Sequence, residues 1–245
     1  LAFVFLGRRV EIVPDSISLE RSSGESDIPG PRERKPVKVR GIYLTSWVAG
    51  DKRLRKTLMD LVEQSELNAM VIDIKDYSGR VAFKTDNPVI KKVGSVEVRI
   101  PDLPEFIQEL HQNEVYAIAR MEVFQDPVYA FARPKEAVHQ KSGAIWQDNK
   151  GLAWVDPASM EAWDYNVQVA LEAEKIGFDE IQVDYVRFPS DGNLSDMVFP
   201  IWDQNIPKRE IISGFLAYFY DQVKPTGVFV SADIFGLTLG RKARP

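Results

Sequence analysis

The feature that most constrains the fold is a regular alternation of strand patterns and amphipathic helix patterns, with no hairpin signal between consecutive strands. Strands are predicted at residues 39–47, 69–75, 115–124, 180–183 and 229–236. Helices are predicted between them at 54–67, 103–112, 158–176 and 208–223. The second strand, AMVIDIK, is nearly all apolar, as expected for a strand covered on both faces. The alternation predicts parallel βα units joined by right-handed crossovers.

Five such units suit either an open doubly wound α/β sheet or a (β/α)8 TIM barrel truncated after about its fifth strand. Two patterns favour the truncated barrel. No glycine-rich phosphate-binding fingerprint follows the first strand, and polar residues recur at the end of every strand. In such a fragment the first and fifth strands are edges that a whole barrel would pair.

Composition limits the domain organisation and the partners. A chain of 245 residues with 44% hydrophobic residues is long enough for one large α/β domain. Its net charge of -5 offers no basic face, which argues against nucleic-acid binding. Cysteine is absent, which excludes disulfides, thiolate nucleophiles and cysteine-ligated zinc. No cofactor fingerprint is present, so no cofactor is expected.

The N-terminal part of the chain is predicted to lie outside the folded domain. Residues 13–38 are rich in Ser, Pro, Gly and alternating charge, as in a flexible linker. We therefore divide the chain into a segment 1–36 and a barrel domain 37–245. The apolar run at 1–6, followed by Gly7, Arg8 and Arg9, resembles the end of a signal peptide or membrane anchor and suggests an extracellular or cell-envelope location. A short strand or a disordered end is the alternative.

The most specific stretch is GFDEIQVDYVRFPSDG at residues 177–192. It places Asp184 at the carboxyl end of the fourth strand, the end that carries catalytic groups in barrels. Asp233 occupies the corresponding depth on the fifth strand, and neighbouring strands lie about 4.8 Å apart. Glycoside hydrolysis needs two such carboxyl groups facing across a sugar. Asp184 and Asp233 are therefore the candidate catalytic pair.

Further polar side chains are predicted around this pair. Arg120 and Glu122 share a face of the third strand by period two. Gln182 and Arg187 are expected to hold Asp184 ionised or to bind a sugar hydroxyl, with Tyr185 beside them. Alternatively, Asp184 and Arg187 simply pair and fix the loop.

Asp73 interrupts an apolar strand, where an ionised group must be paired. A structural ion pair with Arg120 and a substrate contact are equal alternatives for it. Asp76 is expected to be a solvated loop residue or a turn cap. Cation binding by Asp73, Asp76 and Asp184 stays open in principle, but no spacing motif supports a metal site. His111 and His139 are poorly placed as general bases, which argues against a Ser-His-Asp triad.

Aromatic residues are concentrated in the predicted loops. The connection 127–157 shows little regular pattern, and a loop of this length is expected to be functional. Sugar faces offer C–H groups to aromatic rings. The candidates for such stacking are Trp47, Trp146, Trp154 and Trp202, and core packing is the alternative for each.

Several segments together resemble a known family. They are the stretch 177–192, YAIARMEVFQDP in the third strand, WVDP, EAWDYN and SADIFG. Over residues 39–237 the chain is similar to a largely uncharacterised family of bacterial glycoside hydrolase domains, which distantly resembles α-amylase-like barrels. DYVRFP is the most specific part of the match.

The resemblance implies a (β/α)8 barrel, exported or membrane-anchored, that acts on a polysaccharide or cell-envelope glycan by a retaining mechanism. By similarity to amylase-like barrels, Asp184 would be the nucleophile and Asp233 the acid/base. The chain departs from the amylase pattern because Gln182 stands where an arginine is expected, and because the acid is Asp rather than Glu. A carbohydrate-binding barrel of the envelope without catalysis is the alternative function.

Overall fold

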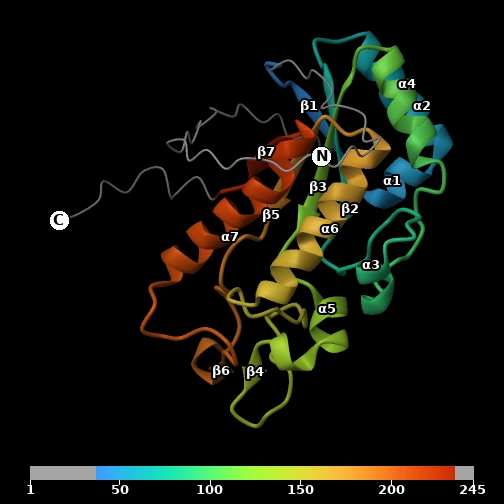
Figure 1. Cartoon of the computed structure of the whole chain (residues 1–245). Coiled ribbons are helices and arrows are strands. Elements are labelled where there is room, and N and C mark those ends of the chain that lie inside the picture. Colours follow the sequence, from blue (N-terminus) through green and yellow to red (C-terminus); the bar gives the residue numbers. More distant parts are fainter. Residues whose placement is uncertain (1–36, 235–245) are drawn as a thin grey trace, which may run out of the picture.

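The structure is a computed structural model that describes residues 37–234, so the apolar run at 1–6, the predicted linker up to residue 36 and Gly236 lie outside it. Its centre is a five-stranded parallel sheet in the order β1-β2-β3-β5-β7. The strands are β1 (Gly41–Leu44), β2 (Ala69–Lys75), β3 (Tyr116–Glu122), β5 (Glu180–Asp184) and β7 (Phe229–Ala232). Spatial order follows chain order, so each crossover advances by one strand, as in the winding of a barrel. Within the described residues the sheet is open, with β1 and β7 at its edges (Figure 1).

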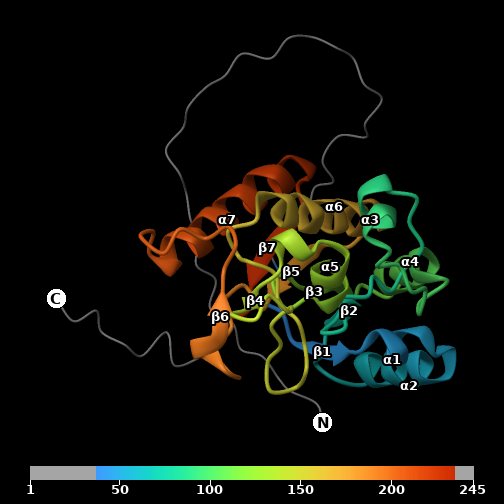
Figure 2. The ribbon, with the colours of Figure 1, turned by 90° about the horizontal axis from the view of Figure 1, so that it is seen from below.

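Four long helices form an arc on one side of this sheet (Figure 2). They are α2 (Lys52–Glu63), α4 (Leu103–Gln112), α6 (Met160–Ile176) and α7 (Lys208–Val223). Their apolar faces bury residues such as Met59, Phe106 and Phe215 against the strands, and this layer is the main core. No helix among residues 37–234 is both long and apolar enough to cross a membrane.

Shorter elements gather at the carboxyl end of the sheet, where α5, β4 and β6 lie together in Figure 1. They are α1 (Ser46–Gly50), α3 (Pro88–Val93), α5 (Pro127–Ala132), β4 (His139–Gln140) and β6 (Met197–Val198), with 3-10 turns at Pro134–Glu136 and Leu194–Asp196. A further 3-10 turn, Lys224–Thr226, lies at the amino end of the sheet, between α7 and β7. β4 and β6 pair antiparallel and so join the connection after β3 to the connection after β5. The connection 127–157 thus contains α5, a 3-10 turn and β4 in its first part, and no named helix or strand from 141 to 157, in keeping with the little regular pattern of its sequence.

The predicted bounds are correct for three elements whose buried residues follow a clear pattern. β2, α4 and α7 have the predicted bounds. The first strand was predicted to reach residue 47, but it ends at Leu44 because Thr45 caps α1, its side chain accepting a hydrogen bond from the Val48 amide. A local capping side chain thus overrides a β-rich pattern.

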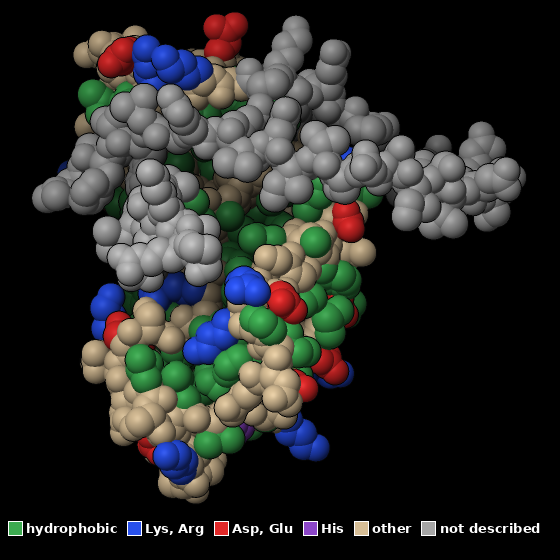
Figure 3. Space-filling view, turned by 90° about the vertical axis from the view of Figure 1, so that its left-hand side faces the viewer, with side chains coloured by type: hydrophobic (Ala, Val, Ile, Leu, Met, Phe, Trp, Pro, Cys, Tyr) green, Lys and Arg blue, Asp and Glu red, His purple; other side chains and the backbone are tan. Residues whose placement is uncertain are grey.

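The concave face of the sheet, opposite the helices, changes character along the strands. Toward the amino ends it is apolar, with Ala69, Tyr116 and Ile118 forming a second small core. Toward the carboxyl ends the same alternation of side chains brings charged residues onto this face. Seen from one side, the described surface intersperses Lys, Arg, Asp and Glu among hydrophobic side chains, without a field of a single charge sign (Figure 3).

Candidate active site

Arg120 of β3 lies at the centre of a cluster of four carboxylates on the concave face. Its Nη1 donates to Oδ1 of Asp73 on β2 at 2.7 Å, and its Nη2 donates to Oδ2 of Asp184 on β5. Nη2 is also 3.4 Å from Oε1 of Glu122, and Nε is 3.8 Å from Oδ2 of Asp233. We call these five residues the Arg120 cluster.

The strand register explains why these residues meet. Asp73 pairs with Arg120 across β2 and β3, and Glu122 pairs with Asp184 across β3 and β5. Asp233 follows β7 directly, and its amide donates to the Val183 carbonyl at 2.9 Å. Parallel strands in sequential order therefore bring side chains from four βα units together, and the predicted adjacency of Asp184 and Asp233 is confirmed.

Asp184 and Asp233 lie in different electrostatic surroundings. The Asp184 carboxylate accepts hydrogen bonds from Arg120 and from the Tyr185 amide. The pKa of Asp233 is raised to about 6, mainly by burial and by the nearby Asp184 charge, against the lowering effects of Arg120 and Gln182. Gln182 donates to Asp233 Oδ1 at 2.7 Å. The pair thus combines a carboxylate that accepts hydrogen bonds from Arg120 and a backbone amide with a carboxyl whose pKa is raised.

Glu122 is a deeply buried acid of the Arg120 cluster. It is 4% exposed, and its Oε2 has no hydrogen-bond partner among the described residues. Burial raises the pKa of Glu122 to about 8, with the charges of Asp184 and Asp73 adding to the effect and that of Arg120 opposing it. This carboxyl therefore keeps its proton to a higher pH than an ordinary glutamate does.

Lys75, which sequence reasoning missed, fixes the position of Glu122. A register shift between Asp73 and Lys75 turns this fully buried lysine away from the concave face. Its Nζ donates to the Glu122 carbonyl at 2.6 Å and pairs with Oδ2 of Asp126 at 2.7 Å. Asp126 also caps α5 through the Tyr129 amide. A lysine that ends an apolar strand was the available signal, since such a group must find a buried partner.

Asp73 is saturated by protein groups. It is 2% exposed, its Oδ1 accepts from Arg120, and its Oδ2 accepts from the Tyr43 hydroxyl of β1. Burial raises its pKa, while Arg120 and the Tyr43 hydrogen bond lower it. Of the two alternatives for Asp73, the ion pair with Arg120 is the one that the structure contains.

Tyr185 occupies a strained position beside Asp184. Its φ of 52° lies in the left-handed region, which non-glycine residues adopt rarely and which often marks functional sites. Its ring packs on Trp154 with centroids 6.0 Å apart, and the Arg187 guanidinium lies 5.1 Å from the Tyr185 ring and 5.4 Å from the Trp154 ring. In place of the predicted pair with Arg187, the interactions that hold Asp184 are those with Arg120 and the Tyr185 backbone.

The candidate tryptophans fall into buried and exposed groups. Trp154 is 1% exposed and donates to Asp148. Its ring packs against Tyr185 and is not accessible for stacking on a ligand. Trp146 is equally buried. Trp202 packs edge-on against Phe188 and Phe199. Trp47 alone among these four presents most of its side chain to solvent.

Two acidic residues outside the cluster organise the loops. Asp156 is fully buried, and its Oδ2 accepts from the amides of Ile201 and Trp202, which joins the connection after β3 to that after β5. Asp76 caps a turn through the Ser78 amide, as predicted, but it is buried and paired with Arg99 at 2.7 Å. The expectation of a solvated Asp76 is wrong because Arg99, distant in sequence, folds over it.

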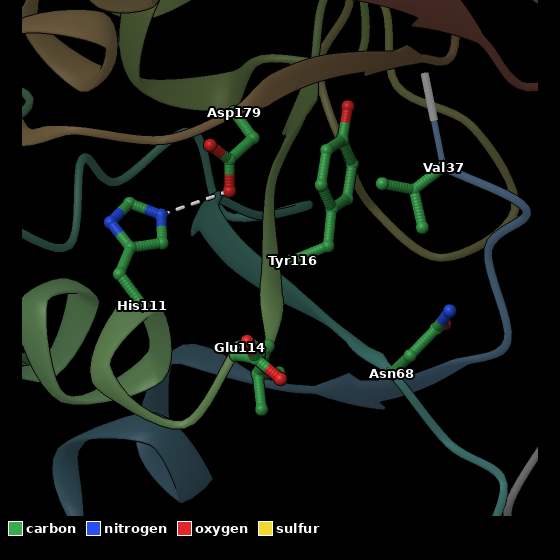
Figure 4. Close-up of a pocket in the computed structure, with 7 residues that line it drawn as sticks. Val37, Asn68, His111, Glu114, Tyr116 and Asp179 are labelled. Carbon is green, nitrogen blue, oxygen red and sulfur yellow. Dashed lines mark hydrogen bonds and ion pairs between the residues drawn. The ribbon is translucent and has the colours of Figure 1, made fainter. Parts of the chain in front are cut away.

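The amino end of the sheet carries a small cavity of about 210 Å³. His111 and Asp179 approach each other on one side of it, with Nε2 and Oδ2 2.9 Å apart, and Val37 and Asn68 lie on the other (Figure 4). In barrels this end serves stability rather than chemistry. Among the described residues no group of three or more His, Cys, Asp or Glu is arranged to hold a metal ion.

Comparison with known proteins places this geometry in context. A model of the family described as "Putative glycosyl hydrolase domain" matches residues 41–244. The crystal structure of a hypothetical protein from Ruminiclostridium thermocellum ATCC 27405 matches with a TM-score of 0.72 and 36% identity, covering 79% of this chain and 97% of that chain. No curated protein matches the chain.

More distant solved structures share the fold. The GH20 exo-β-N-acetylglucosaminidase from Vibrio harveyi matches with a TM-score of 0.59 at 14% identity, over 83% of this chain and 36% of that one. The α-L-fucosidase isoenzyme 2 from Paenibacillus thiaminolyticus matches with a TM-score of 0.54 at 15% identity, over 79% of this chain and 32% of that one. The chain therefore spans about a third of the length of these two enzymes.

Proposed function

The chain belongs to the family of glycosyl hydrolase domains identified above, and from that premise we propose that it hydrolyses an O-glycosidic bond in a polysaccharide or cell-envelope glycan. The observation that carries the proposal is the contact between Asp184 and Asp233 in contrasting electrostatic surroundings. A carboxylate that accepts from Arg120, beside a carboxyl whose pKa is raised, suits a nucleophile and acid pair.

The reaction proceeds by double displacement. The Asp184 carboxylate attacks the anomeric carbon while the glycosidic C–O bond breaks, and the proton of Asp233 passes to the leaving oxygen. Water then attacks the glycosyl–enzyme ester, its proton returns to Asp233, and the sugar leaves with Asp184 restored as a carboxylate. The configuration at the anomeric carbon is retained.

The separation of the two carboxyls supports retention over inversion. Inverting enzymes keep them about 6.5–9.5 Å apart to admit a water, and retaining enzymes about 5–5.5 Å. Here the two carboxyls interact directly, closer than either range, so a sugar must part them, and the gap is far too small for the inverting arrangement. The contact of Asp233 with Arg120 is the longest in the cluster, at 3.8 Å, so a sugar that enters the pair displaces Asp233 with little loss of pairing.

We extend the proposal to the architecture and the location. The five parallel strands would be the first part of a (β/α)8 barrel whose remaining strands pair with β7 and β1. The protein would act at the cell envelope or outside the cell, anchored or exported through the apolar run at residues 1–6.

The test compares Asp184→Asn with Asp233→Asn in the intact protein, on polysaccharides and on aryl glycosides. Asp184→Asn is expected to abolish turnover of both, because the nucleophile is lost. Asp233→Asn should lose polysaccharide turnover yet retain activity on aryl glycosides, whose leaving groups need no proton. Asp179→Asn, at the amino end, is the control. Unchanged turnover by Asp184→Asn would contradict the nucleophile assignment.

A non-catalytic carbohydrate-binding barrel is the second candidate. It is favoured by the Arg120 guanidinium, which contacts both proposed catalytic carboxylates and could serve to fix the strands alone. In that case the wild-type protein turns over no glycan, and the double variant Asp184→Asn, Asp233→Asn binds glycans as tightly as the wild type.

A further inference from the structure

Trp47 is exposed at the same end of the sheet as the Arg120 cluster. It lies on α1, directly after β1, and its side chain is 63% exposed. Tryptophan is a residue that folded proteins usually bury to a large extent. The indole at the carboxyl edge of the strands is therefore accessible to a ligand.

Arg99 supports this indole from one side. Its guanidinium lies 4.6 Å from the ring centroid of Trp47, and its own side chain is only 6% exposed. Because the Arg99 guanidinium covers one face of the ring, the exposed surface of Trp47 lies on the opposite face and the edges. The indole is thus a one-sided platform.

The support is held by many contacts from separate loops. Arg99 pairs with Asp76 at 2.7 Å and with Glu97 at 2.8 Å, and it donates to the hydroxyls of Ser46 at 3.1 Å and Ser78 at 3.2 Å. Its planar fork is therefore oriented before any ligand arrives. A preorganised platform avoids the entropy loss of ordering a side chain on binding.

Gly50 allows the two segments to come this close. A Cβ added at this residue would lie 2.1 Å from the Arg99 carbonyl oxygen, a distance that forces the backbone apart. The glycine at the end of α1 therefore permits the contact that places Arg99 beneath Trp47.

The open face suits a neutral sugar ring. The Arg99 guanidinium already lies over one face of the Trp47 ring, and its positive charge repels a second cation on the opposite face. The C–H face of a pyranose, in contrast, gains from stacking and from burial of apolar area. A neutral or N-acetylated sugar is the ligand class that this surface fits best.

The position of the platform assigns it to a different sugar from the one that is cleaved. Three strand spacings separate β1 from β5, or about 14 Å at about 4.8 Å each. One sugar ring does not span this interval. We propose that Trp47, held by Arg99, binds a pyranose of the same glycan chain at a subsite remote from Asp184, so that the protein selects long glycans. This inference rests on the proposed function for the identity of its ligand.

The experiment measures glycan binding without turnover, in the intact protein carrying Asp184→Asn. The probes are a disaccharide and a hexasaccharide from each of two series, β-1,4-linked N-acetylglucosamine and α-1,4-linked glucose. The readouts are the NMR signal of the Trp47 indole N–H and the dissociation constant of each probe. We expect a hexasaccharide to shift the indole signal and to bind more tightly than the disaccharide of its series.

Matched variants separate the platform from its support. Trp47→Ala is expected to weaken hexasaccharide binding by about tenfold, the upper range for one aromatic contact. Trp47→Phe should retain most of the affinity, and Arg99→Lys should fall between them because an ammonium cannot stack as a plane. The control is Tyr220→Ala on α7, which removes an aromatic ring that also carries a cation, Lys224 at 5.4 Å, but lies on an outer helix.

The outcomes are distinct from those of the hydrolysis test. A hexasaccharide that binds without moving the Trp47 signal, or that binds Trp47→Ala as tightly as the parent, overturns the subsite. So does the absence of an indole shift with all four probes. A shifted signal in a protein whose wild type hydrolyses no glycan supports the subsite and rejects the catalytic proposal.

Discussion

The carboxylates at the two ends of the concave sheet face are paired with donors in different ways. At the amino end, the Glu180 carboxylate of β5 accepts from the hydroxyls of Tyr116 and Ser231, and Asp179 pairs with His111. Each of these acids has its own donors. At the carboxyl end, Arg120 is shared among Asp73, Glu122, Asp184 and Asp233.

This difference has a thermodynamic consequence. Four buried or half-buried carboxylates beside one guanidinium cannot all ionise at low cost, because like charges in a poorly solvated site repel. Protons are therefore retained, as the raised pKa values of Glu122 and Asp233 indicate. The carboxyl end, which has more acids than cations, therefore holds protons that it can transfer. The amino end, where each acid has its own donors, only stabilises the fold.

The largest expected effect comes from removing the shared cation. Arg120→Met should lower the free energy of unfolding by about 3 kcal/mol at pH 7, because it leaves buried carboxylates without their partner. The loss should shrink toward pH 4 as these groups protonate. Arg40→Met is the matched change at the amino end, where Arg40 pairs with exposed Glu66 at 2.8 Å, and should cost less than about 1 kcal/mol. Urea unfolding checks both, and equal losses would erase the distinction between the ends.

The next effect is a pH dependence. The pKa of Glu122 is raised to about 8, so the folded state binds its proton more tightly than the unfolded chain, and stability is lost as pH rises from about 4.5 to 8. Glu122→Gln mimics the protonated form at every pH. Relative to wild type it should therefore gain stability across this window, on the order of 2 kcal/mol at pH 8. Urea unfolding at several pH values measures this difference. If the free energies of unfolding of Glu122→Gln and wild type differ by the same amount from pH 5 to 9, the pKa of Glu122 is not raised.

The sequence was informative about the strands that carry these acids. Period two placed Arg120 and Glu122 on one face, and the sequential order of parallel units brought Asp184 next to Asp233. Both inferences depend on backbone geometry that every β-sheet shares. They hold without knowledge of the side chains that surround the strands.

Contacts between loops could not be derived in this way. Asp156 binds the amides of Ile201 and Trp202, 45 and 46 residues away, and Arg99 covers Asp76 from beyond α3, 23 residues along the chain. Such pairs have no period and no local signature. For the same reason the sequence could not separate buried Trp154 from exposed Trp47, because each environment is made by chain distant in sequence.

A smaller effect compares two tyrosines on the same face. Tyr43→Phe removes the hydroxyl that donates to Asp73 Oδ2 and leaves a buried carboxylate one donor short, at a cost of about 1.5 kcal/mol. Tyr116→Phe, at the amino end, removes one of two hydroxyls from the half-buried Glu180 and should cost less than about 1 kcal/mol. Thermal unfolding at pH 7 measures both. The reverse order would mean that Asp73 is neutral and needs no second donor.

The smallest effect is expected at the cavity of the amino end. The His111 ring and the Asp179 carboxylate form an exposed pair on α4 and the turn before β5, and pairs of this kind contribute about 0.2–1 kcal/mol. His111→Gln should therefore change stability by less than about 0.5 kcal/mol, since Asp179 still accepts the Ala117 amide at 2.9 Å. Glycan hydrolysis and hexasaccharide binding should both equal those of the wild type. A loss of either would assign the amino end a part in function, and the contrast between a balanced end and an acid-rich end would no longer locate the active site.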